Sequence, residues 1–172
     1  FIGYYTAAWN IAQFLMIFGA SLSQTLFPEM SELSVREDRK AVADLFDSAL
    51  SYAGMILIPG LIGGGILGER ILQIYGPDFT QAGVVLVVLI IATLFQAYQK
   101  QYTTTLNAVD RPELAFRVNV LFIMANVILN VVLIYFHGWI GAAVATAGSV
   151  GSSLLLAHYY LSRVIEFEVP VA

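Results

Sequence analysis

Long apolar stretches, separated by short charged or turn-forming segments, make up most of this chain. Lys, Arg, Asp and Glu are absent from four such stretches, residues 1–28, 48–68, 79–99 and 118–162. A helix of about 20 apolar residues, rising about 1.5 Å per residue, crosses a hydrocarbon core of about 30 Å. The last stretch is long enough for two crossings with a turn at His137–Trp139. The pattern predicts five membrane-spanning helices, at about residues 5–27, 48–70, 81–107, 114–136 and 139–162.

The segment after the first span is polar, and residues 29–47 carry nine of the twenty formal charges. The first span is expected to end at Phe27–Pro28. Ser34 and Glu37 have the spacing of a capping box, and apolar residues follow at helical intervals. The pattern predicts an amphipathic helix at about residues 34–47, lying at the membrane interface and running into the second span. A solvated loop helix is the simpler interpretation of its charges, and a site for lipid headgroups or a partner is the alternative.

The second span contains residues that weaken a helix. Proline removes a backbone hydrogen bond, and glycine loosens the turns around it. In lipid, such a helix persists only where neighbouring helices or water satisfy the freed backbone groups. The sequence predicts a bend, either a hinge for transport or a fixed kink, and a terminating turn at IYGPDF. The hinge candidates are Pro59, Gly60, Gly63, Gly64 and Gly65.

Composition changes the picture from apolar helices to an integral membrane protein. Of the 172 residues, 59% are hydrophobic and 12% charged, against about a quarter charged in soluble domains. We therefore expect an all-α membrane protein forming a single membrane domain over residues 1–172. The chain has no cysteine, and His137 and His158 lack a second ligand at metal spacing, so both are expected to be interfacial. No nucleophile–base pair, carboxylate dyad or phosphate-binding glycine loop is present, so we predict no enzymatic activity, cofactor, metal or nucleic-acid partner.

The positive charges give an orientation. Six of the eight Lys and Arg residues fall in segments on one side of the predicted spans, whereas Arg70 falls on the other. The positive-inside rule then makes loop 28–47, the 108–117 turn and the C-terminus cytoplasmic. The N-terminus, the 70–80 turn and His137–Trp139 face outward, in a multi-pass protein of the cell membrane. The abrupt ends and the odd number of spans indicate a piece of a longer transporter, whose N-terminal lobe is missing.

Polar residues recur on single faces of three spans. In the third span, Gln96 and Lys100 belong to such a face, and in the fourth Asn126 and Asn130 do. Polar groups in a span avoid lipid, so they face other helices or water. We favour a shared hydrated cavity over interhelical hydrogen bonds. The cavity candidates are Asn10, Gln13, Gln96, Lys100, Asn119, Asn126 and Asn130.

Two further features of the spans bear on chemistry. Lys100 is either a contact for a substrate phosphate or a lysine that snorkels to the interface. No Asp or Glu lies deep in a span, so this part of the protein shows no cation-coupling site. In the fifth span, small residues at intervals of three or four predict close helix packing, at Gly141, Ala145, Gly148 and Ser152.

The order of these elements resembles the multidrug/oligosaccharidyl-lipid/polysaccharide flippase superfamily, closest to its polysaccharide-exporter branch. The matching segments run in family order, as IGYYTAAWNI, LFPEMSEL, ILQIYGPDFTQAGVVLVVLI, LNAVDRPELAFRVN and NVILNVVLIYFHGWIGAAVATAGS. The resemblance implies a transporter of 12–14 helices in two lobes, working by alternating access. This chain would be most of the C-terminal lobe, with five transmembrane helices and one cytoplasmic amphipathic helix.

The resemblance also implies the substrate, a glycan on a polyprenyl phosphate or pyrophosphate. Such flippases often hold the phosphate with cavity arginines. No predicted span has a deep arginine, which leaves Lys100 or the N-terminal lobe for that role. We therefore expect a flippase of lipid-linked oligosaccharide for cell-surface glycan synthesis, in contact with the bilayer and this substrate. The alternatives are a drug/cation antiporter of the same superfamily, which needs membrane-embedded acids, and a non-transporting membrane scaffold, whose polar faces would pack dry.

Overall fold

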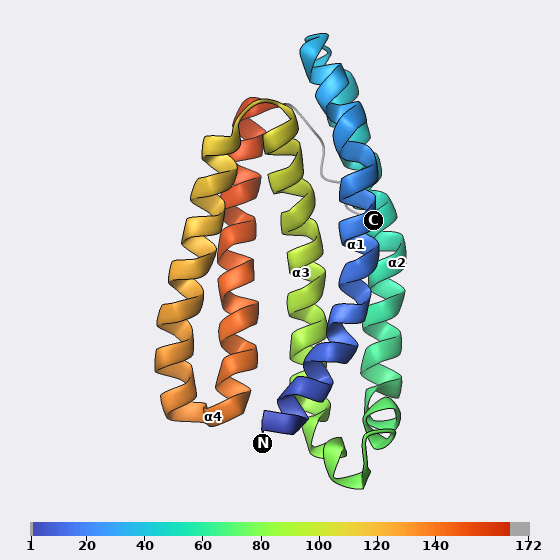
Figure 1. Cartoon of the computed structure of the whole chain (residues 1–172), viewed down its shortest axis with the longest axis vertical. Helices are drawn as coiled ribbons and strands as arrows, with labels where there is room; N and C mark the ends of the chain where they lie inside the picture. Colours follow the sequence, from blue (N-terminus) through green and yellow to red (C-terminus); the bar gives the residue numbers. More distant parts are fainter. Residues whose placement is uncertain (1, 166–172) are drawn as a thin grey trace.

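The computed structural model describes residues 2–165, which form four α-helices and one short 3₁₀ helix. The prediction of an all-α protein is confirmed for this part of the chain. The helices run roughly along the long axis of the molecule (Figure 1). Their bounds are Ile2–Val35 for α1, Arg39–Gln73 for α2, Pro77–Ala82 for the 3₁₀ helix η1, Gly83–Ala108 for α3 and Pro112–Val164 for α4.

Four helical segments of the described chain have the length and composition to cross a membrane. They are Gly3–Val35, Arg39–Gln73, Pro77–Ala108 and Pro112–Val164. The last is 53 residues long and reverses direction at Gly138, whose φ of 58° and ψ of −140° are not helical. Figure 1 shows the two halves of α4 side by side as a hairpin. The chain thus turns within the predicted His137–Trp139 segment, and the count of five crossings stays a prediction.

The first helix is longer than the sequence analysis predicts. α1 continues through Pro28 to Val35 instead of ending at Phe27–Pro28. A proline costs a helix one hydrogen bond but leaves its other turns intact, so an otherwise regular helix can continue past it. At 34 residues, α1 is roughly 51 Å long, which exceeds the membrane core and carries its last turns beyond it.

The boundary after α1 also corrects the prediction. The helix expected from about Ser34 begins at Arg39 instead, and it runs on into the rest of α2 as expected. The Ser34–Glu37 capping box does not form, because Glu37 lies in the turn with a φ of 58°. Asp38 is the cap instead, and its Oδ1 accepts a hydrogen bond of 3.0 Å from the amide of Ala41.

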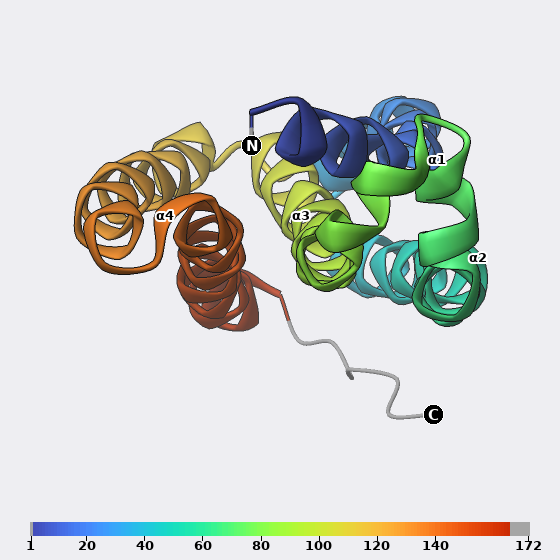
Figure 2. The same cartoon turned by 90° about the horizontal axis from the view of Figure 1, so that it is seen from below.

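α3 is the helix on which the others pack. It contacts α1, α2 and α4, and Figure 2 shows it between the α4 hairpin and the pair α1 and α2. The buried side chains form one cluster around Met30, Phe46 and Leu106 and another around Leu72 and Leu89. α3 therefore carries most of the packing between the α4 hairpin and the pair α1 and α2.

Glycine permits the closest helix approach inside the α4 hairpin. A Cβ on Gly141 would overlap the carbonyl of Leu133, and a Cβ on Gly148 would lie 3.3 Å from Leu129 Cδ1. Ala145, between these glycines in the sequence, is fully buried, whereas Ser152 is exposed. The predicted close packing thus holds for the first three of the four small residues.

Candidate functional site

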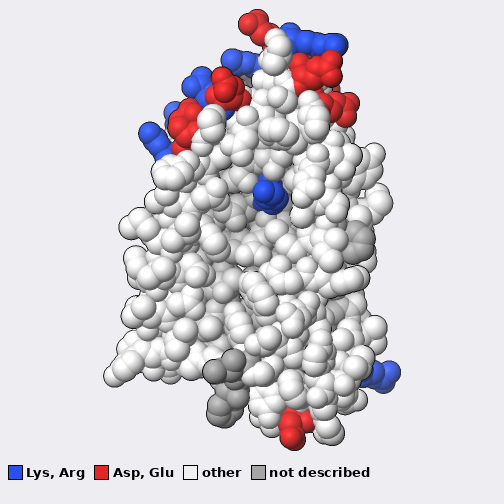
Figure 3. All heavy atoms as spheres, in the orientation of Figure 1, with Lys and Arg blue, Asp and Glu red and all other residues white. Residues whose placement is uncertain are grey.

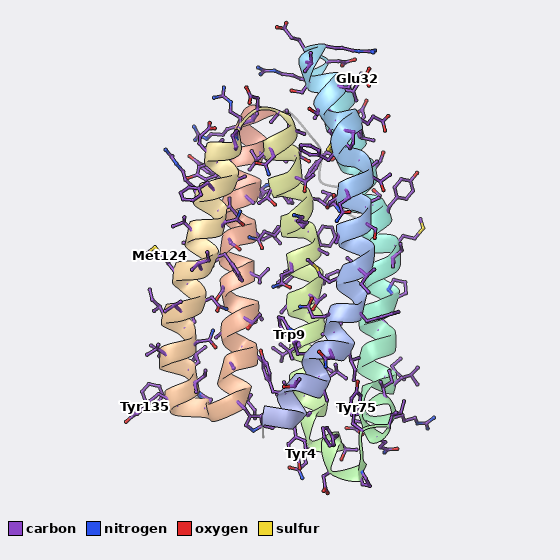
Figure 4. The ribbon with its side chains drawn as sticks, viewed as in Figure 1. Tyr4, Trp9, Glu32, Tyr75, Met124 and Tyr135 are labelled. Atoms are coloured by element: carbon purple, nitrogen blue, oxygen red, sulfur yellow. The ribbon has the colours of Figure 1, made fainter. Side chains whose placement is uncertain are left out.

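Charge is concentrated at one end of the molecule, which we call the charged end (Figure 3). It comprises the end of α1, the start of α2, the α3–α4 turn and the end of α4. Aromatic side chains gather at the other end, where Tyr4 and Tyr75 lie near each other (Figure 4). Tyr4 packs edge-on against Phe79 at 4.9 Å between ring centroids, and Tyr75 lies 5.9 Å from Phe79. An apolar body between charged and aromatic ends is typical of a protein in a bilayer.

One face of α3 lies between its contacts with α1 and with the second half of α4. Toward α1, a Cβ on Gly19 would lie 2.8 Å from Ala97 Cβ, and Gln101 Nε2 donates to the Gly19 carbonyl at 3.2 Å. Toward the second half of α4, Phe95 lies 4.0 Å from the position of a Cβ on Gly151. The face between these two contacts belongs to the residues at positions 96, 100 and 107.

Gln96 and Lys100 occupy this face, so they lie between α1 and α4. Gln96 is half-buried and Lys100 is exposed. Figure 3 shows this side of the molecule hollowed below the charged end, with blue atoms set apart from the other charged groups. Lys100 is eight residues before the end of α3, or about 12 Å along its axis. This face of α3 therefore presents a positive charge together with the polar side chain of Gln96.

Two threonines of α3 satisfy their hydroxyl groups within the helix. Thr93 Oγ1 donates to the Leu89 carbonyl at 2.8 Å, and Thr103 Oγ1 donates to the Gln99 carbonyl at 3.1 Å. Both threonines are buried. They add little polarity to the hollow, because their hydroxyls bond backward along α3.

The two cavity candidates on α1 lie on different sides of that helix. Gln13 is half-buried and is nine residues from Leu22, half a turn around the helix, and Leu22 packs against α2. Gln13 therefore lies on the side of α1 away from Leu22. Asn10 is exposed and lies on the side of α1 opposite the buried Ala12 and Gly19, which face away from it.

The asparagines of α4 contact one another. Asn130 Nδ2 donates to the Asn126 carbonyl at 2.8 Å and to Asn126 Oδ1 at 3.0 Å, and both side chains are half-buried. Asn119 is exposed, two turns closer to the charged end. The hydrogen bonds described for this pair run within α4, not between helices.

The hinge candidates in α2 differ in their surroundings. The helix runs from Arg39 to Gln73 with Pro59 inside it. A Cβ on Gly64 would overlap Ile90 of α3, so this glycine permits close packing. A Cβ on Gly63 or Gly65 would meet no atom within 4 Å, so neither glycine is needed for packing in this conformation.

Sequence reasoning missed polar contacts that join helices. Tyr102 Oη lies 3.2 Å from His158 Nδ1, which ties α3 to the second half of α4. His158 is thus half-buried between helices, and its interfacial position stays a prediction. Gln101 ties α3 to α1 through Gly19. Gln101 and Tyr102 are buried because of the helices that pack on α3. In the sequence, the only sign of these contacts was a polar residue beside an otherwise apolar helix face.

The sequence matches a known protein family and two relatives over nearly its whole length. The family described as lipid II flippase MurJ matches residues 2–169. The probable flippase AglR of Haloferax volcanii is 37% identical over 99% of this chain. The probable low-salt glycan biosynthesis flippase Agl15 of the same organism is 30% identical over 97% of this chain. The chain spans 37% of the length of AglR and 36% of the length of Agl15.

A solved structure has the same fold. The lipid II flippase MurJ in an inward closed conformation superposes with a TM-score of 0.81 over 94% of this chain. The chain covers 36% of that structure, and 20% of the aligned residues are identical. The helices described above therefore have the fold of about a third of that structure.

Proposed function

The chain belongs to the lipid II flippase MurJ family, and on this premise we propose that it is a lobe of a flippase for polyprenyl-linked oligosaccharide. AglR is named a probable flippase and Agl15 a probable low-salt glycan biosynthesis flippase, and the second name supports a glycan-linked substrate. The chain spans just over a third of these relatives, which supports a longer protein with a further lobe, and we propose that this chain is the C-terminal lobe. The transporter would belong to the polysaccharide-export branch of its superfamily and would work without catalysis.

The observation that carries the proposal is the cation within the hollow between α1 and α4. A sugar–phosphate headgroup needs a polar, positively charged route, whereas its polyprenyl chain stays in lipid. In this proposal Lys100 supplies the charge, and Gln96 on the same face of α3 and Gln13 of α1 supply hydrogen-bonding groups. We assign these three residues, together with the Asn126–Asn130 pair and Asn119, to the path of the headgroup. Asn10, on the exposed side of α1, would join this path if the second lobe packs against that side.

The orientation belongs to the proposal as well. With the charged end in the cytoplasm, the substrate enters near the arginines and leaves near the aromatic end. Alternating access would then move the headgroup past Lys100 in the outward direction. The hinge candidates of α2 would supply the flexibility, with Gly63 and Gly65 as the residues free of packing constraints.

The proposal is tested by genetic replacement in the native host. Deleting the gene should make lipid-linked oligosaccharide accumulate on the cytoplasmic leaflet, and the full-length protein should restore its export. The variant N126L/N130L should insert normally but fail to export the glycan, because the polar pair is replaced by apolar groups. The matched control is V127L/V131L, which changes two exposed apolar residues on the same helix and should export normally.

Other outcomes would contradict the proposal. Full export by N126L/N130L would remove the asparagine pair from the path. Unchanged glycan export after gene deletion, with loss of drug resistance instead, would indicate the antiporter. Loss of neither activity would favour a membrane scaffold.

A further inference from the structure

A second feature at the charged end lies apart from the hollow that holds Lys100. It is a cavity of about 490 Å³ where the ends of α1, α2, α3 and α4 meet. Three arginines line it: Arg39 at the first residue of α2, Arg111 in the α3–α4 turn and Arg163 in the last turn of α4. Glu37 is the one carboxylate among the described lining residues, so three cations and one anion give the lining a net charge of +2.

These arginines make few strong ionic contacts. Arg111 Nη1 lies 3.7 Å from Glu113 Oε1, and both side chains are more than half exposed, so this pair is weak. The contacts described for the other two are with neutral groups. Arg39 Nη1 donates to the Val164 carbonyl at 3.5 Å, and Arg163 lies 4.8 Å from the centre of the Tyr159 ring. The positive charge of the cavity is therefore largely uncompensated by the described carboxylates.

The backbone adds to this positive potential. α2 and α4 both begin at the cavity, and the start of a helix carries a partial positive charge that favours anions. Arg39 and Arg111 stand at these two starts, where a cation is unfavourable. Asp38 caps α2, but no side-chain hydrogen bond caps α4 at Arg111. A bound anion would offset the positive charge of the arginines and the partial positive charge of the two helix starts.

The rest of the lining indicates which anion fits. Val42, Val109 and Val164 lie beside the arginines, so the cavity has apolar as well as positive walls. It also lies at the ends of membrane-spanning helices, at the level expected for headgroups. Arginine matches phosphate oxygens with two parallel N–H donors, and basic pockets between transmembrane helices hold anionic headgroups. We propose that this cavity binds the phosphate group of an anionic membrane lipid. The inference concerns lipid binding and does not depend on transport.

The test measures lipid binding to the purified full-length protein in neutral detergent. Native mass spectrometry counts bound phosphatidylglycerol, and a thermal melt reports the stabilisation it gives. The variant R39Q/R111Q/R163Q should lose one bound lipid, and its affinity should fall about fivefold for each arginine removed. R111Q/R163Q, which keeps the Arg39–Val164 contact, should show an intermediate loss and guards against a folding defect.

The control removes the same charge elsewhere. R36Q/R70Q/R117Q changes three exposed arginines that do not line the cavity, and it should bind phosphatidylglycerol as the parent does. An equal loss of phosphatidylglycerol binding in this control would mean that only the net charge matters, and it would overturn the proposed site. Unchanged binding by the cavity variant would overturn it too. Stabilisation by phosphatidylcholine, or by inorganic phosphate at the same concentration, would also contradict a site for an anionic lipid.

Discussion

Gly141 has no room for a side chain, because the carbonyl of Leu133 lies where its Cβ would be. That carbonyl belongs to the backbone of the facing half of α4, so the clash moves a helix rather than a rotamer. We expect G141A to lower the free energy of unfolding by about 1–3 kcal/mol or more. A thermal melt of the purified protein measures the loss.

Gly151 is the matched control for this substitution. A Cβ there would lie 4.0 Å from Phe95 Cδ2, an ordinary van der Waals distance. G151A should keep the parental melting temperature or raise it, because alanine favours helix over glycine by about 1 kcal/mol. Equal melting temperatures for G141A and the parent would show that the hairpin relaxes without cost.

Substitutions at Lys100 distinguish a contact with the substrate phosphate from a lysine that snorkels to the interface. A lysine that bonds a phosphate through a charge-assisted hydrogen bond contributes about 1.5–3 kcal/mol. We therefore expect K100Q to slow glycan export at least tenfold, whereas K100R keeps the charge and much of the rate. Export of a fluorescent lipid-linked oligosaccharide from proteoliposomes gives the rates. Equal rates for K100Q and the parent would leave Lys100 with an interfacial role only.

At the scale of elements, α2 combines glycines that packing requires with glycines that it does not. Gly63 and Gly65 have no neighbour within 4 Å of an added Cβ, so alanine there stiffens the helix without a clash. We expect G63A/G65A to stabilise the protein by up to about 2 kcal/mol and to slow transport severalfold. Thermal melts and proteoliposome export measure the two effects.

The substitution G64A distinguishes the effect of a stiffer helix from the effect of altered packing, because Gly64 lies in the same turn but contacts α3. G64A pushes against Ile90 of α3, so it should shift the contact between α2 and α3 without the same gain in stability. A stabilised G63A/G65A protein with the parental transport rate would mean that α2 carries a fixed kink rather than a hinge.

Element boundaries show what the sequence could predict. Gly76, with a φ of 133°, and Pro112, in the first turn of α4, end and begin helices for local reasons that are visible in sequence. Pro28 misled the prediction, because the cost of a proline inside a helix is offset by the turns that continue on both sides of it. The capping residue was also misplaced, since Ser34 and Asp38 both favour helix starts and only the backbone of the turn decides between them.

The candidate site was less predictable than the fold, because it depends on which helices become neighbours. Periodicity placed Gln96 and Lys100 on one face of α3, and the structure puts that face between α1 and α4. Periodicity gave no sign that Gln101 reaches Gly19 or that Tyr102 meets His158. Those contacts follow from the packing of α3 against helices far away in the sequence.

At the scale of the whole molecule, the chain lends itself to a topology test because it has no cysteine. Single cysteines at Asp78 and His137 should react from outside with a membrane-impermeant maleimide, since both positions are exposed. Cysteine at Glu37 should react only after the cells are permeabilised. Gel shift of the full-length protein in a cysteine-free background records each result.

The position of His137 decides the number of crossings. Labelling of H137C from the same side as D78C agrees with five spans, because the two halves of α4 then cross separately. Labelling of H137C together with E37C would contradict both the five crossings and the orientation proposed from the positive charges. D110C, in the α3–α4 turn, should behave like E37C and serves as the internal control.

The central place of α3 also sets an order for synthesis. The ribosome delivers α1 and α2 before the helix on which both pack, so Gly19 is already present when Gln101 enters the membrane. His158 follows Tyr102 by 56 residues, which at about 5–20 residues per second is a delay of roughly 3–11 s. The contact between α3 and the second half of α4 is therefore the last to form. Completion of the α4 hairpin, rather than the arrival of α3, therefore completes the helix packing described for residues 2–165.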